Sequence, residues 1–165
     1  FLEIPLNSPD PFESIRRLAE DPPADVHVGA GTVLRPEDVT AVARAGGGYI
    51  LAPNTDFDVI RRTKDHGLIS IPGFFTPSEA FAAVNAGADL LKLFPAARLG
   101  ERYIKDLRAV LPAPIIAVGG IGPENLGDYL DAGAAAVGIG SSLYKPGVNG
   151  IELRARAEAL IHALR

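Results

Sequence analysis

The fold of this chain is decided by the stretch Leu90-Leu91-Lys92-Leu93-Phe94-Pro95-Ala96, in which apolar residues surround one lysine and a proline ends the run. This length and this ending suit a strand buried on both faces, as in a parallel sheet. Burial disfavours the charged form of a lysine, which lowers its pKa and leaves more of it as a free amine. Such an amine is a nucleophile for carbonyl carbons, whereas a lysine at a strand end can also extend its ammonium group into solvent. This stretch alone leaves both interpretations of Lys92 open.

Strand-like and helix-like segments alternate on both sides of this stretch, with a repeat of about 20 to 25 residues. Such an alternation predicts right-handed crossovers and a parallel sheet. The expected strands are 1–6, 26–30, 49–52, 68–71, 90–96, 115–118 and 136–139. The expected helices are 12–20, 36–45, 57–66, 77–85, 103–111, 123–132 and 151–164, the last of them amphipathic.

The pattern favours a (β/α)₈ TIM barrel, an α/β fold, over a doubly wound sheet. No Gly-x-Gly-x-x-Gly motif follows the first strand, and the helices are of similar length with no long crossover. A TIM barrel has eight strands and the pattern shows seven. The chain starts at Phe1, inside a strand and without a methionine. We therefore expect the first strand and helix to precede Phe1, and residues 1–165 to form a single barrel domain of units two to eight.

The composition excludes several classes of partner. The net charge is -4 and the chain has no cluster of lysine and arginine, so nucleic acid and anionic membranes are not expected partners. No apolar run reaches the length that spans a membrane. The absence of cysteine excludes disulfides and thiolate metal sites and fits a reducing compartment, so a cytoplasmic protein is expected. The three histidines lie far apart, and we expect neither a metal nor a cofactor.

The active site of a TIM barrel lies at the carboxyl ends of its strands. Because side chains alternate along a strand, Leu91 and Leu93 point toward the helices and Lys92 points into the barrel. The same alternation turns Glu3 inward. An inward amine and an inward carboxylate are either a buried ion pair that adds little stability, or a nucleophile with its general acid/base. We favour the second reading, because structural barrel interiors contain mainly Val, Ile and Leu.

Glycine-rich turns supply the other candidate site residues. Gly119-Gly120 and Gly140-Ser141 follow strands seven and eight of the inferred barrel, where these folds often bind phosphate, although tight turns also need glycine. In Gly29-Ala30-Gly31-Thr32 the glycines allow a ligand to approach the backbone, and the threonine offers a hydroxyl to a carboxylate or is a turn spacer. Together these features predict a site for a small molecule with a carbonyl and a phosphate, with Schiff-base chemistry at Lys92.

Five stretches, in this order and at this spacing, resemble one known family. They are Leu2-Glu3-Ile4-Pro5-Leu6-Asn7-Ser8-Pro9, Val28-Gly29-Ala30-Gly31-Thr32-Val33-Leu34, Lys92-Leu93-Phe94-Pro95-Ala96, Val118-Gly119-Gly120-Ile121 and Gly140-Ser141. The chain resembles, over essentially its whole length, the KDPG/KHG aldolase family. These are class I aldolases that cleave 2-keto-3-deoxy-6-phospho sugar acids.

The resemblance implies a role for each candidate residue. Lys92 matches the Schiff-base lysine and Glu3 the general acid/base. It implies that the substrate, a phosphorylated keto sugar acid, and the product pyruvate are bound by Gly31, Thr32, Val118, Gly119, Gly120, Gly140 and Ser141. Of these, Thr32 matches the site of the pyruvate carboxylate, and Gly119, Gly120 and Ser141 match the phosphate site. The family also implies a homotrimer without a cofactor.

Two features distinguish branches of the family. The run Ile-Pro-Leu-Asn-Ser-Pro over residues 4–9 and the residue Val118 resemble the branch that acts on the galactonate epimer; the gluconate branch usually has Thr-Leu-Arg-Thr and Thr there. The gluconate epimer and 4-hydroxy-2-oxoglutarate are the alternative substrates. The alternative functions are a phosphate-binding isomerase without an imine and a sugar-phosphate-binding barrel without catalysis. The chain departs from the family in lacking its early Arg-Gly pair, and in having Gly122 where Thr or Ser is common.

Overall fold

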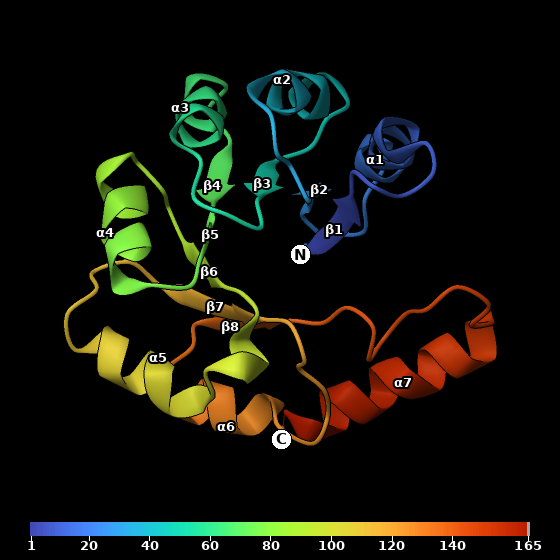
Figure 1. Ribbon diagram of the computed structural model, residues 1–165. Helices are drawn as coiled ribbons and strands as arrows, with labels where there is room; N and C mark the ends of the chain where they lie inside the picture. The colour runs from blue at the N-terminus through green and yellow to red at the C-terminus, as the bar shows by residue number, and fades with distance from the viewer. Residues whose placement is uncertain (165) are drawn as a thin grey trace. The chain divides into compact units, whose positions relative to one another are not determined.

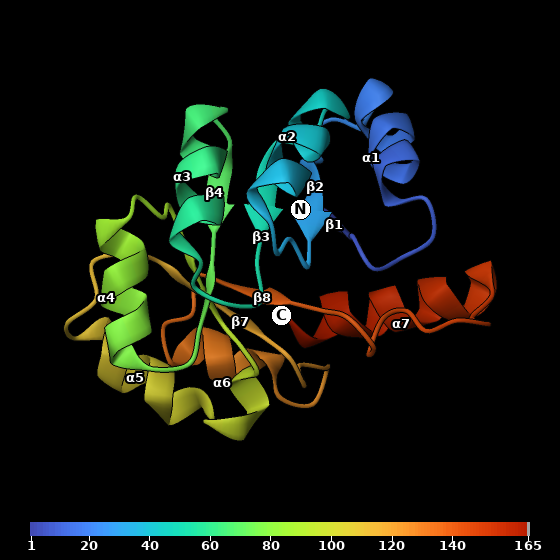
Figure 2. The same cartoon turned by 45° about the horizontal axis from the view of Figure 1, so that its top comes forward.

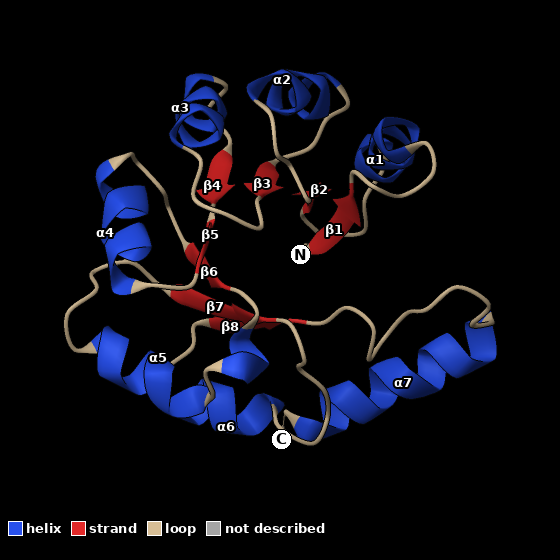
Figure 3. Ribbon diagram, viewed as in Figure 1, coloured by secondary structure: helices blue, strands red, loops and turns tan. Residues whose placement is uncertain are grey.

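The computed structural model describes residues 1–164, and in it strands and helices alternate along the chain (Figure 3). The chain divides into two compact units, one from Phe1 to Lys92 and one that begins at Leu93, and each is described by itself. No helix within the described residues is long and apolar enough to cross a membrane.

The first unit is built on a parallel sheet with the strand order β1-β2-β3-β4, with helices α1, α2 and α3 along one face of it (Figures 1 and 2). A short strand, a fourth helix and the start of the Lys92 strand follow. The elements are β1 (Leu2–Pro5), α1 (Pro11–Glu20), β2 (Val28–Gly31), α2 (Pro36–Arg44), β3 (Tyr49–Leu51), α3 (Phe57–Asp65), β4 (Ile69–Ile71), β5 (Gly73–Phe74), α4 (Pro77–Asn85) and β6 (Leu91–Leu93).

The helix-facing side of this sheet forms the core of the first unit. Ala30 and Ile50 are paired in register, and both are buried against the helices that flank them. They belong to a cluster of buried apolar side chains, each worth roughly 1.5–3 kcal/mol when fully buried. Its members are Ile15, Val28, Ala30, Val33, Val39, Val42, Ile50 and Val59. Because side chains alternate along a strand, Glu3, Gly29, Gly31 and Tyr49 are left on the opposite face of the sheet.

The strand predicted over 68–71 is present as β4, and a further short strand that was not predicted follows Pro72. β4 stops at Ile71 and extended pairing resumes as β5 after this one residue. Proline has no N–H to donate to a ladder, but its carbonyl accepts a hydrogen bond of 2.9 Å from the backbone of Lys92. The predicted end of the strand is therefore confirmed, and the carbonyl at the break holds the backbone of Lys92.

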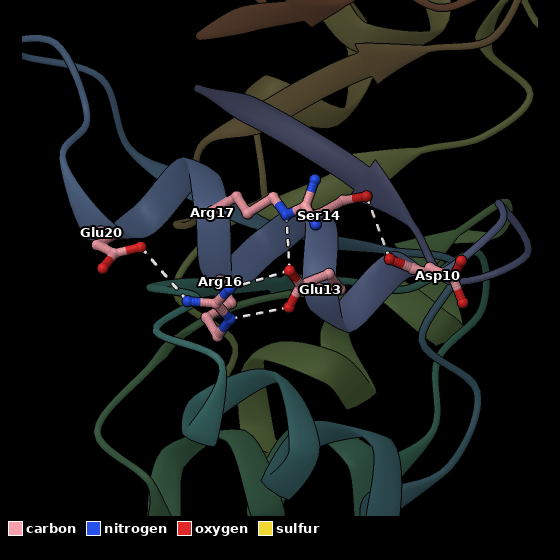
Figure 4. Close-up of polar contacts among 6 residues, drawn as sticks. All are labelled: Asp10, Glu13, Ser14, Arg16, Arg17 and Glu20. Atoms are coloured by element: carbon pink, nitrogen blue, oxygen red, sulfur yellow. Dashed lines mark hydrogen bonds and ion pairs between the residues drawn. The ribbon is translucent and has the colours of Figure 1, made fainter.

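The helices of the first unit begin within one residue of the predicted positions. Thr76 and Glu79 form a capping box at the start of α4. Asp10 is the N-cap residue of α1, but its φ of 43° turns its side chain away from the capping position, and its backbone carbonyl accepts from Ser14 instead. Figure 4 shows that the exposed face of α1 is bridged by Glu13, which accepts from Arg16 and Arg17. These hydrogen bonds, first that from Arg16, lower the pKa of Glu13 to about 2.

In the second unit the strands β7 and β8 pair in parallel, with Val118 of β7 opposite Gly138 of β8. Its core contains the buried side chains of Ile104, Leu107, Ile115 and Leu126. The elements are the 3₁₀ helix η1 (Ala96–Arg98), α5 (Glu101–Arg108), β7 (Ile115–Val118), α6 (Leu126–Asp131), β8 (Ala136–Gly138) and α7 (Gly150–Ala163).

Two helices of this unit differ from the prediction. α6 begins at Leu126 rather than at 123, because the Asn125 side chain turns back to the preceding loop and holds residues 122–125 in a turn. α7 is not amphipathic in the expected way. Its Leu160 is buried, whereas Ile151 on the opposite face is 85% exposed.

Candidate active site

Lys92 is buried, with 6% of its surface exposed, in the middle of β6 between two fully buried leucines. The apolar strand around Lys92 is also the sequence feature that predicted it as a candidate nucleophile. Burial lowers the pKa of the Lys92 ammonium, and the negative charge of Glu3 opposes that shift only in part. The residue is therefore a better nucleophile than an exposed lysine at the same pH.

Glu3 lies on β1, at the edge of the sheet, and its carboxyl group reaches over β2. Its Oε1 atom occupies the space that a side chain at position 31 would fill. The glycine at 31 thus gives the carboxylate its place on the face of the sheet that is free of helices. Glu3 as a residue is exposed, but burial of its carboxyl end raises its pKa, and the charge of Lys92 opposes this in part.

Glu3 and Lys92 are thus within electrostatic reach of each other inside the first unit. Each would be ionised if exposed, and in each the loss of solvent is the largest influence on the pKa. Both pKa values move toward neutral pH, so the pair can exchange protons more readily than a carboxylate and an ammonium in water. Such a pair suits carbonyl chemistry at an amine, as predicted from the alternation of side chains.

Thr32 follows β2 directly, with its backbone in the left-handed region at a φ of 56°. This conformation is rare for a β-branched residue and costs roughly 1–3 kcal/mol. Residues in such conformations cluster at binding sites. The structure thus places a strained hydroxyl residue after Gly31, at the carboxyl end of β2, where the resemblance implies a carboxylate site.

The second unit holds the predicted phosphate residues. Gly119 and Gly120 follow β7 with φ values of 96° and 76°, which favour glycine. A Cβ at Gly120 would lie 2.5 Å from the Cβ of Ala97, so the turn packs closely on η1. Gly140 begins a turn after β8 and its carbonyl accepts from Tyr144. Ser141 is exposed in that turn.

Val118 ends β7 with its side chain over Gly138. A Cβ at Gly138 would lie 2.7 Å from Cγ2 of Val118, so the valine requires a glycine beside it on β8. The valine is half-buried, as is Ile116 on the same face of the strand. Val118 therefore lies at the carboxyl end of β7, and its role in binding remains a prediction.

The sequence did not point to three residues that support these groups. The Asn125 side chain accepts from the backbone N–H of Gly122 and donates to the carbonyl of Gly120, both at 3.0 Å. Ser142 donates to the carbonyl of Ile121 at 2.6 Å. Tyr49, on the face of β3 that carries Glu3 on β1, is almost fully buried. A polar side chain inside the apolar run Tyr49-Ile50-Leu51 was the only signal for the last.

Among the described residues, no group of three or more His, Cys, Asp or Glu side chains is arranged to hold a metal ion. The first unit instead brings the amine of Lys92 and the carboxylate of Glu3 within electrostatic reach of each other. This set can form a covalent imine and move protons.

Comparison with known proteins agrees with this chemistry. The family model described as "KDPG and KHG aldolase" matches residues 1–158. The 2-dehydro-3-deoxy-6-phosphogalactonate aldolase of Escherichia coli (strain K12) is 46% identical over 166 residues, which cover 99% of this chain and 81% of that protein.

Solved structures give the same fold. One described as the native KDPGal structure has a TM-score of 0.95 and 45% identity, over 99% of this chain and 80% of that chain. A KDPG aldolase from Legionella pneumophila has a TM-score of 0.80 and 28% identity, over 99% of this chain and 78% of that chain. That protein was captured with pyruvate as a covalent carbinolamine. The α/β fold with parallel strands is thus of the TIM-barrel type of these aldolases, as predicted.

Proposed function

Since the chain belongs to the KDPG and KHG aldolase family, we propose that it is a class I aldolase that cleaves 2-dehydro-3-deoxy-6-phosphogalactonate to pyruvate and D-glyceraldehyde 3-phosphate. The observation that carries this proposal is the buried Lys92, whose pKa is lowered by burial and which has Glu3 as a charged neighbour. An imine-forming lysine needs a free amine, and a neighbouring carboxylate can move the protons that imine formation requires.

In the proposed reaction the Lys92 amine adds to the C2 ketone and forms a carbinolamine. Loss of water, with Glu3 transferring the proton directly or through a water molecule, gives an iminium ion. Glu3 then takes the proton from the C4 hydroxyl as the C3–C4 bond breaks. The electron pair of that bond passes into the iminium and forms an enamine, and the aldehyde leaves as glyceraldehyde 3-phosphate. Protonation of the enamine at C3 and hydrolysis release pyruvate and restore the amine.

We assign the two ends of the substrate to different turns. The hydroxyl of Thr32 and the backbone at Gly31 would hold the carboxylate next to the ketone. Backbone N–H groups at Gly119, Gly120 and the Gly140-Ser141 turn would hold the phosphate, since such turns can direct several N–H groups at one anion. Val118 would contact the substrate at the end of β7.

Borohydride trapping tests the covalent step. Reduction of the protein in the presence of pyruvate should attach the three carbons of pyruvate to Lys92, located by peptide mass spectrometry. Lys92→Ala should lose the adduct and turnover. Lys64→Ala is the matched control, because Lys64 is a partly exposed lysine of the same unit, paired with Asp89 at 2.7 Å. An adduct on another lysine, or none with the wild-type chain, would rule out the proposed chemistry and leave the isomerase or the binding barrel.

The preferred substrate requires a second measurement. The names of the similar aldolases and the residues at 4–9 and 118 support the galactonate epimer. The value of kcat/KM should therefore be higher for the galactonate epimer than for the gluconate epimer or for 4-hydroxy-2-oxoglutarate. A higher value for either of the others would move the chain to another branch of the family.

We also propose that the enzyme works as a homotrimer in the cytoplasm. The resemblance supports three copies, and the exposed side chains of Phe57 and Phe81 give the first unit apolar surface that association could bury. The absence of cysteine supports a reducing compartment. Light scattering at several protein concentrations should give three times the mass of the chain, and a stable monomer would contradict the trimer.

A further inference from the structure

Tyr49 carries a buried hydroxyl for which the described residues provide no hydrogen-bond partner. The residue is 2% exposed. A phenylalanine would fill the same space without burying a polar group, and buried polar groups without a partner are rare in folded proteins. The hydroxyl therefore calls for an explanation other than packing.

The register of three strands shows where this side chain points. Glu3 is paired with Gly29, and Tyr49 lies in the same row one strand further, because Ala30 is paired with Ile50. Glu3 and Tyr49 thus stand on either side of Gly29 and on the same face of the sheet. The Tyr49 ring lies in the space that a side chain at Gly29 would fill.

The ring therefore leans across β2 toward β1. The ring of Phe1 meets it in an edge-on arrangement with the centroids 5.4 Å apart, which places the phenol beside the residues of β1. A tyrosine is long enough to carry its hydroxyl across the spacing of one strand. The inner-face residue of β1 in this row is Glu3.

Lys92 and His27 are the other titratable residues that the contacts of Glu3, Tyr49 and Phe1 bring into this group. The charge of Lys92 on β6 also acts on the Glu3 carboxylate. His27, which precedes β2, packs against Phe1 with the rings tilted by 40°, and it lines a pocket together with Tyr49. Burial raises the pKa of the Tyr49 hydroxyl and the charge of Glu3 raises it further, so the phenol stays protonated and is a hydrogen-bond donor at neutral pH.

We propose that Tyr49 is a positioning residue for Glu3: its hydroxyl donates a hydrogen bond to one water molecule, which in turn donates to the Glu3 carboxylate and holds it in place for proton transfer. This inference rests on the proposed role of Glu3 as the general acid/base. The donated bond favours the ionised carboxylate, so it opposes the effect of burial on the pKa of Glu3. Gly29 is part of the arrangement, because only a residue without a side chain lets the ring cross β2.

Tyr49→Phe tests the proposal because it keeps the ring and removes only the donor. The pKa of Glu3, followed by carbon-13 NMR of labelled glutamate and assigned with Glu3→Gln, should rise by about one unit, which corresponds to tenfold in the ionisation constant. The acidic limb of kcat/KM should move to higher pH, and kcat should fall by about tenfold. Tyr129→Phe is the control, since Tyr129 is a buried tyrosine of the second unit; it should change none of these values.

Two results would separate failure of this inference from failure of the proposed function. If borohydride traps the Lys92 adduct but Tyr49→Phe leaves the pKa of Glu3 and the pH profile unchanged, the Tyr49 hydroxyl is a buried group with no role in positioning Glu3. The Tyr49→Phe variant should then unfold at a higher urea concentration than the wild type, because it buries one polar group less. If no adduct forms on Lys92, the aldolase proposal fails, whereas the NMR titration still reports whether Tyr49 binds Glu3. Tyr49→Leu adds a check on packing: if the ring alone matters, Leu should lower activity and Phe should not.

Discussion

The carboxyl group of Glu3 lies in the space that a side chain at Gly31 would occupy. The two residues come from neighbouring strands, and Gly31 is paired in register with Pro5, two residues beyond Glu3. The Glu3 side chain therefore leans toward the carboxyl end of the strands, the end at which active sites of this fold lie. The absence of a side chain at one position thus sets the place of a functional group at another.

This relationship predicts that Gly31→Ala should damage catalysis more than folding. The backbone of Gly31 does not have a positive φ, so alanine is compatible with it, but the new Cβ would displace the Glu3 carboxylate. A misplacement of about 1 Å can cost about 100-fold in rate. We expect kcat to fall by about that factor, as measured by coupling the release of pyruvate to its reduction.

Gly127→Ala is the matched control for this substitution. Gly127 lies in α6 and a Cβ there would meet nothing within 4 Å. Alanine should stabilise the helix by roughly 0.5–1 kcal/mol and leave kcat unchanged. Equal kcat values for the two variants would show that the position of Glu3 does not limit the reaction.

The coupling between Glu3 and Lys92 predicts a shift in pH dependence. The charge of Glu3 raises the pKa of Lys92 against the larger effect of burial. Removal of that charge in Glu3→Gln should therefore lower the pKa of Lys92 further below its ordinary value. The rate of adduct formation with pyruvate, which needs the free amine, should reach its half-maximum at a lower pH than in the wild type.

Glu37→Gln serves as the reference for this experiment. Glu37 is an exposed acid on α2 in the same unit, so its removal changes the net charge equally. Its midpoint should match the wild type, because exposed and distant charges are screened by salt. If the pH of half-maximal adduct formation is the same in Glu3→Gln as in the wild type, Glu3 and Lys92 are not coupled in solution.

The strand pattern predicted most of this fold from local features. Strands buried on both faces are short apolar runs bounded by glycine and proline, and all seven predicted strands are present. The two features that local patterns did not predict, the strand β5 and the start of α6 at Leu126, depend on other segments. Whether an extended chain resumes after Pro72 depends on which backbone its carbonyl can bind, and the start of α6 depends on the Asn125 side chain. Neither partner can be identified from a local sequence window.

Part of the candidate site could also be predicted from local sequence patterns. Alternation along one strand is enough to turn Lys92 and Glu3 inward. The position of the Tyr49 ring over Gly29 requires the register of three strands, which no periodicity reports. Tyrosine in an apolar strand is usually a core residue, so the sequence alone does not distinguish Tyr49 from a residue that only packs in the core.

Substitutions at Thr32 can separate the backbone strain at this residue from the proposed binding of the substrate carboxylate by its hydroxyl. At a φ of 56°, Thr32→Gly removes the steric cost of the side chain, and the free energy of unfolding should rise by about 1 kcal/mol in urea titrations. The same change removes the hydroxyl proposed to hold the carboxylate, so KM should increase. Thr32→Ser keeps the hydroxyl and should keep KM. If the glycine variant proves less stable, the Thr32 side chain contributes packing that outweighs its strain.

Asn125 offers a test of the phosphate site that does not touch the proposed ligand groups. Its side chain joins Gly120 and Gly122 by two hydrogen bonds of 3.0 Å, so Asn125→Ala should loosen that turn. We expect KM for the phosphorylated substrate to rise by about tenfold, equivalent to about 1.4 kcal/mol. The kinetics with 4-hydroxy-2-oxoglutarate, which has no phosphate, should stay the same.

Asn149→Ala is the matched comparison, because Asn149 also makes two side-chain hydrogen bonds in the second unit, at the start of α7. Loss of that cap should cost about 1 kcal/mol of stability without changing KM for either substrate. A rise of KM in both variants would indicate a general loosening of the unit. A rise in the Asn125 variant for both substrates would show that the Gly119–Gly122 turn contacts a part of the substrate other than its phosphate.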